Sequence, residues 1–159
     1  MFSLIAAVGK NRELGLKGGL VFHIKEDMQF FKETTMGHPV LMGLNTYRSL
    51  PKALPGRKNF VLAHDVSDVD DPNVTVVTDL DSFISNNLNT DEEIFVIGGA
   101  FVYHEMLPYC QNLYLTEINA AAEADVFFPE FDTTKYDKMV LKKGQSDDLS
   151  YTFAKYIKK

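Results

Sequence analysis

The chain has no tryptophan, a single cysteine and no long uninterrupted hydrophobic segment. Because Cys110 has no second thiol to pair with and the histidines are scattered, an internal disulfide and a zinc-binding spacing are both excluded. No stretch approaches the roughly 20 apolar residues of a membrane-spanning helix. Basic runs are limited to Lys142-Lys143 and Lys158-Lys159, and the net charge is -6, which disfavours nucleic acid and anionic membranes as partners. Small molecules are therefore the expected ligands, with no metal.

The length and composition favour a single domain. A chain of 159 residues that is 45% hydrophobic can form one substantial core, so we expect one domain over residues 1–159. The apolar run Phe2–Val8 is short, lacks a preceding basic residue and has no cleavage pattern after it, which indicates a buried strand. No exposed hydrophobic helix argues for a dimer. We therefore expect a cytoplasmic monomer.

Strand and helix signals alternate along most of the chain. Apolar runs predict strands at 2–8, 39–42, 59–62, 74–77, 93–97 and 113–118. Helical patterns cover 24–35, 45–50, 79–88 and 100–107, whereas Gly9–Gly19 is too irregular for either and is expected to be a loop. The stretches 138–142 and 151–157 alternate and are expected to pair. The order predicts an α/β fold with a mostly parallel sheet, helices on both faces and a C-terminal antiparallel edge.

Asp27 is an acidic residue on the apolar side of a predicted helix. At about 100° per residue, the helix 24–35 places Asp27 in the same arc as Phe30, Phe31 and Met28, whereas Glu26 falls on the solvated side. A carboxylate removed from water needs hydrogen-bond donors. Asp27 is therefore either a structural acid bonded to the backbone or to a core hydroxyl, or an acid that waits for a ligand with donors.

Two predicted strands run into glycine and then into a helix. Met42-Gly43 precedes Asn45-Thr46, which we expect to cap a short helix, and Ile97-Gly98-Gly99 precedes the helix from Ala100. Such junctions let a phosphate approach the main chain and the free N–H groups of the first turn. Glycine is also a common turn device, and neither site has a dinucleotide fingerprint or a P-loop. Two junctions in one sheet favour a dinucleotide, which has two ends to anchor.

Two further polar residues each have two readings. Arg57, after Pro55-Gly56, is either a solvated turn residue or a guanidinium fork for a substrate carboxylate. Thr116 is either an ordinary residue of its strand or a partner of the site. The residues alone leave both alternatives open.

Taken together, the chain resembles dihydrofolate reductase over nearly its whole length. The matching pieces, whose order and separations make the match specific, are Ser3–Ala7, Leu14-Gly15, Asp27 with Phe30–Lys32 and Thr34, Pro39–Gly43, Thr46, Leu54–Asn59, Val96–Gly99 with Val102-Tyr103, Leu113–Thr116 and Phe128-Pro129. The resemblance implies an eight-stranded fold and a cis Gly98-Gly99 peptide. It also implies NADPH-dependent reduction of 7,8-dihydrofolate to tetrahydrofolate, with hydride transfer to C6 and protonation at N5.

The same resemblance implies the roles of the site residues. Asp27 would bind the 2-amino group and N3 of the pteridine, with support from Thr116, and would reach N5 only through a water. The implied catalytic residues are Asp27, Phe22 and Thr116. The implied substrate-binding residues are Ile5, Ala6, Asp27, Met28, Phe31, Leu50, Leu54, Arg57, Ile97 and Thr116. The implied cofactor-binding residues are Ala7, Leu14, Gly15, Leu20, Gly43, Leu44, Asn45, Thr46, Leu62, His64, Ile97, Gly98, Gly99, Ala100, Phe101, Val102 and Tyr103. The segment Gly9–Val21 would be a mobile lid.

Three positions depart from the family pattern. Val21-Phe22 stands where Pro-Trp is common, so the indole N–H that orders a water is missing and we expect altered proton delivery or altered antifolate contacts. Leu44 stands where an arginine pairs with cofactor phosphates, and His64 is our candidate for the 2'-phosphate, ahead of Arg48. Ala124-Asp125 stands where Gly-Asp is frequent, so the loop that supports the lid keeps its acid but loses a flexible residue.

Two other functions compete with this interpretation. A nicotinamide-dependent reductase of another pterin or of a pyrimidine could use the same fold, although it would not need the combination of Asp27, Phe31 and Arg57. A module that binds a nucleotide or folate without turnover is the second alternative, favoured only by the missing tryptophan. Oxidation of NADPH that depends on dihydrofolate distinguishes all three.

Overall fold

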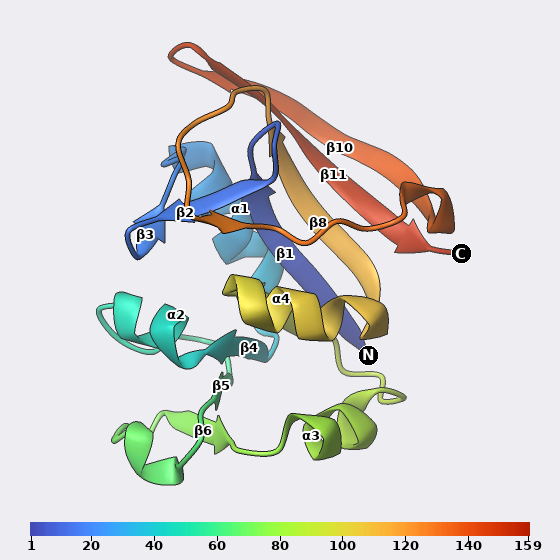
Figure 1. Cartoon of the computed structure of the whole chain (residues 1–159). Helices are drawn as coiled ribbons and strands as arrows, with labels where there is room; N and C mark the ends of the chain where they lie inside the picture. The colour runs from blue at the N-terminus through green and yellow to red at the C-terminus, as the bar shows by residue number, and fades with distance from the viewer.

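The computed structural model describes residues 1–159, and its centre is one eight-stranded sheet in the order β10-β11-β8-β1-β7-β4-β5-β6 (Figure 1). Its strands are β1 (Phe2–Val8), β4 (Val40–Gly43), β5 (Asn59–Leu62), β6 (Val74–Val77), β7 (Ile94–Gly98), β8 (Cys110–Ile118), β10 (Tyr136–Ser146) and β11 (Leu149–Lys158). The strands from β8 to β6 run parallel, whereas β11 pairs antiparallel with both β8 and β10. The predicted fold class, including the antiparallel C-terminal edge, is confirmed.

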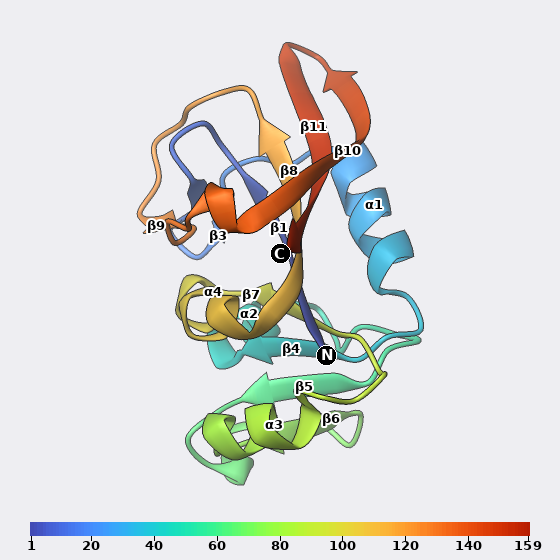
Figure 2. The same ribbon diagram turned by 90° about the vertical axis from the view of Figure 1, so that its right-hand side faces the viewer.

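Helices cover both faces of this sheet. They are α1 (Lys25–Thr35), α2 (Leu44–Ser49), α3 (Leu80–Asn87) and α4 (Ala100–Met106), with single 3-10 turns at Val66–Asp68, Leu107–Tyr109 and Thr133–Lys135. In a view along the sheet, α1 and α4 lie on opposite sides (Figure 2). Alternation along β1 sends Leu4 into the core shared with α3 and α4, and Ile5 into the core beside α1 and α2. None of the helices is long and apolar enough to cross a membrane.

The segment Gly9–Gly19 is not the plain loop that we predicted from the sequence. It contains β2 (Glu13–Leu16), which pairs antiparallel with β3 (Gly19–Leu20) on one side and with β9 (Val126–Phe127) on the other. Lys17 and Gly18 make the turn between β2 and β3 with positive φ angles of 50° and 82°. A partner strand more than a hundred residues away supplies part of this pairing, so local periodicity could not reveal it.

The starts of three helices can be compared with their predictions. Asn45-Thr46 does not cap the short helix: α2 begins at Leu44, its N-cap is Gly43 and no side chain bonds its first turn. Asp79 does cap α3, because its Oδ1 accepts the N–H of Ser82 at 3.1 Å. The first helix was predicted one residue too early, since Ile24 is its N-cap. The Gly98-Gly99 peptide is cis, as expected.

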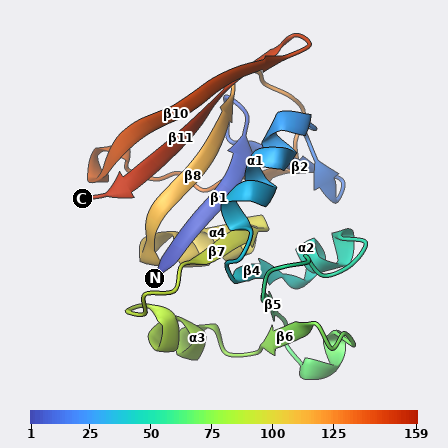
Figure 3. The same ribbon diagram turned by 180° about the vertical axis from the view of Figure 1, so that it is seen from behind.

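The C-terminal hairpin is attached to α1 through Glu26, which is not the solvated acid that the helical projection suggested. Its carboxylate accepts hydrogen bonds from Tyr151 Oη at 2.7 Å and Lys142 Nζ at 2.6 Å. From behind, α1 crosses in front of β1 (Figure 3). Glu26 and Asp27 are neighbours in sequence, so the hairpin helps to fix the helix that carries Asp27.

We expect Gly144→Ala to weaken this attachment. A Cβ at Gly144 would lie 2.5 Å from Glu26 Oε1 and would also overlap the Tyr151 ring, so both groups would have to move. Overpacking of this kind should lower the free energy of unfolding by about 1–3 kcal/mol, measured by urea denaturation. Gly19→Ala is the control, because the nearest atom to its added Cβ is 3.8 Å away. Equal losses in the two variants would contradict the prediction.

Candidate active site

The Asp27 carboxylate lies half-buried against the central strand β8. Thr116 of β8 donates its hydroxyl to Asp27 Oδ1 at 2.6 Å, and no other protein group hydrogen-bonds this carboxylate. Thr116 itself is buried and is paired in register with Ala7 of β1. A carboxylate can accept several hydrogen bonds, and Thr116 supplies one. The Asp27 carboxylate therefore has acceptor positions that no protein group uses.

Burial raises the pKa of the Asp27 carboxyl, and the hydrogen bond from Thr116 opposes that shift. Desolvation is the larger of the two causes. No cation is paired with the carboxylate to offset it. A carboxylate in this state gains stability when a ligand supplies N–H donors, and the gain is larger for a cationic or polarised ligand. The geometry therefore favours the ligand-binding interpretation of Asp27. The bond to a core hydroxyl, which the structural interpretation expected, is also present and is made by Thr116.

Several predicted substrate-binding residues gather in one apolar cluster beside Asp27. Ile5 is buried in this cluster, and four half-buried side chains pack against it: Phe31, Leu50, Leu54 and Ile97. They come from β1, α1, the end of α2, the following turn and β7, so the fold brings together residues from distant parts of the chain. Partly exposed apolar walls around a single acid suit a flat ring with an array of donors at one edge.

Arg57 is held at the other end of α1 without an acidic partner. Its Nη1 donates to Thr35 Oγ1 and its Nε to the carbonyl of Pro55, both at 3.0 Å. Desolvation lowers the pKa of the Arg57 guanidinium, and the chain's ion pairs do not include it. Thr35 is in turn bonded to the carbonyl of Phe31 at 2.8 Å. The guanidinium is therefore positioned by its surroundings and keeps donors free, as a carboxylate-binding fork requires.

The two glycine junctions lie side by side. Met42 of β4 pairs with Gly98 of β7, so α2 and α4 begin next to each other at the same edge of the sheet. A Cβ added at Gly99 would lie 3.4 Å from Thr46 Oγ1, and one added at Gly43 would lie 3.2 Å from Val102 Cγ2. Neither helix has a side-chain cap, so main-chain N–H groups at both starts remain available to an anion.

Tyr103 connects the glycine junctions to the apolar cluster. Its hydroxyl donates to the carbonyl of Ile5 at 2.7 Å. A Cβ added at Gly98 would lie 3.3 Å from the Tyr103 hydroxyl oxygen. Gly98 also has a φ of +125°, where side chains are strained. Burial, followed by the charge of Asp27, raises the pKa of Tyr103, so the phenol stays neutral and acts as a donor.

The remaining predicted residues occupy varied positions. Met28 is 63% exposed, which corrects its assignment to the interior arc: it lies at the margin of that arc, where α1 no longer covers the sheet. Leu20 and Phe101 are also exposed, at 62% and 66%, and His64 lies exposed just after β5. The others are buried or half-buried, except for exposed Asn45: Ala6, Ala7, Leu14, Gly15, Phe22, Leu44, Thr46, Leu62, Ala100 and Val102.

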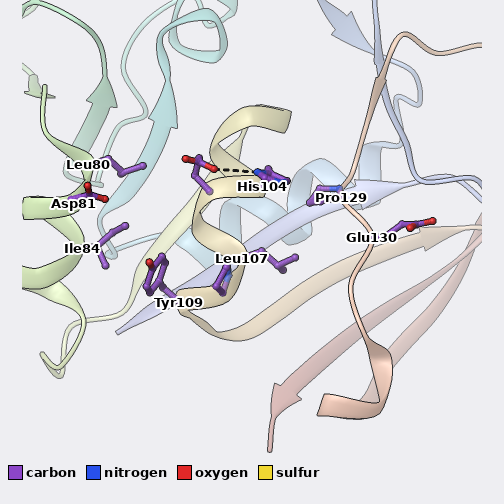
Figure 4. A pocket seen from close by; sticks show the side chains of 10 residues that line it. Leu80, Asp81, Ile84, His104, Leu107, Tyr109, Pro129 and Glu130 are labelled. Atoms are coloured by element: carbon purple, nitrogen blue, oxygen red, sulfur yellow. Dashed lines mark hydrogen bonds and ion pairs between the residues drawn. The ribbon is translucent and has the colours of Figure 1, made fainter.

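Two hollows lie away from Asp27. One of about 380 Å³ lies between α3, the end of α4 and Pro129-Glu130, where the dashed line in Figure 4 joins His104 to Glu105. The second, of about 610 Å³, lies between the base of β2 and the C-terminal hairpin. Neither is lined by a predicted catalytic, substrate-binding or cofactor-binding residue, although Gly9, Lys10 and Arg12 of the predicted lid line the second.

The sequence patterns missed Glu13. This acid is 1% exposed and lies on the buried side of β2, in a segment that we predicted to be a loop. Asp125, the acid that we expected to support the lid, contacts this segment. Asp125 Oδ2 accepts the N–H of Lys17 at 3.0 Å, and the N–H of Asp125 bonds the carbonyl of Gly15 at 3.0 Å.

Replacing the Thr116 hydroxyl should change the titration of Asp27. Thr116→Val removes the donor that stabilises the ionised form, so the pKa of Asp27 should rise further above its usual value. A ¹³C NMR titration of the Asp27 carboxyl in the unliganded protein measures this. Thr116→Ser keeps a hydroxyl and should titrate close to the wild type. Identical curves for Thr116→Val and the wild type would contradict the assignment.

Comparisons with known proteins agree with this geometry. The family model described as dihydrofolate reductase matches residues 1–158. A dihydrofolate reductase of Bacillus subtilis (strain 168) is 36% identical, covering 100% of this chain and 95% of its own length, and one of Neisseria gonorrhoeae is 34% identical, covering 99% and 98%. A solved dihydrofolate reductase from Enterococcus faecalis, complexed with NADP(H) and RAB-propyl, superimposes with a TM-score of 0.89 at 27% identity, covering 99% and 96%. The chain belongs to the dihydrofolate reductase family.

Proposed function

We propose that the Asp27 cluster and the adjoining glycine junctions carry out the reduction of dihydrofolate with NADPH. The chain is an NADPH-dependent oxidoreductase of this family, and the proposal concerns which residues perform the reaction. The observation that carries it is the arrangement along α1. Asp27 lies near one end of the helix and Thr35, which holds Arg57, lies at the other.

The helix sets the distance between the two polar anchors. Eight residues separate Asp27 from Thr35, which at about 1.5 Å per residue corresponds to about 12 Å along the axis. Dihydrofolate is an elongated molecule with a pteridine at one end and a glutamate at the other. Asp27 would receive the 2-amino group and N3 of the pteridine, and Arg57 would hold the glutamate α-carboxylate. Phe31, Leu50 and Leu54 would enclose the apolar middle.

The glycine junctions fit the cofactor. NADPH supplies the hydride when it is bound. The N–H groups at the starts of α2 and α4, opened by Gly43, Gly98 and Gly99, would bind its pyrophosphate, because no side chain occupies these helix ends. Tyr103, fixed by the Ile5 carbonyl, would form part of the wall on which the nicotinamide rests.

Asp27 would act on the substrate by orientation and polarisation. Burial raises the pKa of its carboxyl and so disfavours the anion in the free protein, whereas ligand N–H donors would favour the anion. N5 is at the opposite end of the pteridine from the 2-amino group, so a water would have to relay the proton. Phe22 packs near Ile24 and Phe153 and has no N–H to order such a water.

In this proposal, the lid is Gly9–Val21, a segment that contains the β2–β3 hairpin. Asp125, on the loop before β9, is bonded to both Gly15 and Lys17, and this holds the hairpin in place. In the proposed reaction, the lid excludes water from the nicotinamide and the pteridine. Loss of the usual glycine at Ala124 would stiffen the supporting loop.

We further propose that residues 1–159 act as one domain and as a cytoplasmic monomer that also binds antifolate inhibitors. The long edge strand β10 exposes Met139, Val140 and Leu141, but Lys138 and Lys142 flank them and a register shift interrupts the pairing there, which disfavours edge association. The net charge of -6 disfavours binding to nucleic acid.

Asp27→Asn tests the proposed function directly. The variant keeps the shape of the side chain but loses its negative charge, so dihydrofolate-dependent NADPH oxidation should fall by about 100-fold or more. In the wild type, the raised pKa of Asp27 contributes stability to the unliganded protein that is present at low pH and is lost as pH rises through that pKa. This pH dependence should be absent in Asp27→Asn.

Glu33→Gln, on the exposed side of the same helix, is the matched control and should keep wild-type turnover. Steady-state absorbance at 340 nm, a standard wavelength for NADPH, follows the reaction. Wild-type turnover that survives Asp27→Asn with an unchanged pH profile would refute the assigned mechanism.

The preference for NADPH over NADH should depend on His64. Leu44 packs against the apolar cluster and offers no charge, whereas His64 lies exposed beyond β5 and can donate to a 2'-phosphate. His64→Gln should therefore lower the ratio of kcat/KM for NADPH to that for NADH by about threefold to tenfold. Arg48→Gln is the comparison, and a larger loss there would transfer the role to Arg48.

A further inference from the structure

Glu13 is a buried carboxylate that the proposed reaction does not use. It lies on β2 with 1% of its surface exposed, yet both oxygens have strong donors: Asn11 N–H bonds Oε1 and Ala122 N–H bonds Oε2, each at 2.7 Å. The two donors belong to different loops. Residues 9–12 lead from β1 into the lid, and residues 119–125 lead from β8 towards β9.

The chain around Glu13 is shaped to admit its carboxylate. A Cβ at Gly9 would lie 2.5 Å from Glu13 Oε1 and 2.9 Å from the carbonyl of Ala120, so a larger residue would displace the acid. The same two loops are joined by the N–H of Lys10, which bonds the carbonyl of Ala120 at 2.9 Å. Glu13 therefore sits inside a ring of main chain that both loops close.

The donors outweigh the cost of burial. Desolvation alone would raise the pKa of Glu13, but the hydrogen bonds from the main chain, with Ala122 the largest contributor, hold that pKa below its usual value. Glu13 is thus an anion in the folded protein. Its two bonds to neutral N–H groups are charge-assisted and directional, so they define where one loop lies against the other.

We propose that Glu13 is a positioning residue for catalysis, an internal carboxylate anchor that holds the base of the lid against the 119–125 loop. It acts at the base of the hairpin, whereas Asp125 acts near its tip through Lys17. This inference rests on the proposed role of Gly9–Val21 as the lid. Leu14, the residue after Glu13, packs against the core cluster that contains Tyr103, so the anchor fixes a segment in contact with that cluster.

Glu13→Gln is the decisive variant. Its side chain keeps one acceptor but presents an NH₂ to the second backbone N–H, so one loop loses its bond while the volume is unchanged. The control is Glu123→Gln, which makes the same charge change at an exposed, unbonded acid of the 119–125 loop that Glu13 contacts. Glu13→Ala adds a third variant that removes both bonds.

The first readout is hydride transfer in single-turnover experiments with saturating NADPH and dihydrofolate. We expect Glu13→Gln to slow this step by about tenfold or more, with little change in the KM for dihydrofolate, because a misplaced lid affects the reacting geometry more than substrate binding. A purely structural loss would lower the active fraction and leave the single-turnover rate constant unchanged. A rate constant within about twofold of Glu123→Gln would overturn the proposal.

The second readout is amide hydrogen exchange of the unliganded proteins. In Glu13→Gln, exchange should accelerate by about tenfold or more at whichever of the Asn11 and Ala122 amides faces the new NH₂, and in Glu13→Ala it should accelerate at both, while β1 and β8 keep wild-type protection. Unchanged exchange at both amides would overturn the anchor, whatever the kinetics. If wild type and Glu123→Gln show no dihydrofolate-dependent oxidation, the proposed function fails, and the exchange experiment still decides whether Glu13 joins the loops.

Discussion

The hydrogen bond from Thr116 to Asp27 joins the central strand β8 to α1 and supplies only part of what a desolvated carboxylate needs. Such an acid destabilises the free protein, so the helix that carries it must be held by other contacts. Glu26 attaches the first turn of α1 to the C-terminal hairpin, and Thr35 attaches its last turn to Arg57. The first attachment is next to Asp27 in sequence, and the second is at the far end of the helix. They allow Asp27 to remain half-buried and incompletely satisfied, which is the state that a ligand with N–H donors stabilises most.

The carboxylates of Glu13 and Asp27 both lie away from solvent, but they differ in how many internal hydrogen-bond donors they have. Glu13 is more deeply buried than Asp27, yet its pKa is lowered because two main-chain N–H groups enclose the carboxylate. The pKa of Asp27 is raised because a single hydroxyl does not compensate for its desolvation. Depth of burial therefore does not distinguish an anchor from a binding group. The number of internal donors distinguishes them. A carboxylate whose two oxygens both have internal donors is held in position, and a carboxylate with a single donor can accept further bonds from a ligand.

The parts of this molecule that the sequence predicted are those in which a local pattern and the tertiary environment agree. Long apolar runs produced β1, β5 and β6 at or near their observed limits, and the helical projection correctly placed Asp27 away from solvent. The β2–β3 hairpin was missed because its pairing with β9 joins residues far apart in the chain. Glu13 was missed because Gly9–Gly19 shows neither period and was predicted to be a loop, and because one of its two donors, Ala122, is distant in sequence. Met28 was misplaced because a projection gives an angle and not the extent of the surface that covers it.

The cofactor end presents a separate electrostatic problem. Leu44 occupies the first position of α2 and contributes to the apolar cluster, so this position offers an anion no charged side chain. The nearest candidate cation after β5 is His64, and acidic residues follow it directly. Those acids are turned towards their own backbone: Asp65 accepts from Ser67 and caps the turn, and Asp68 accepts from the N–H of Asp65. Their negative charge is thereby partly compensated locally. A phosphate at this edge can then interact with the imidazole and the helix starts with less repulsion than the sequence alone suggests.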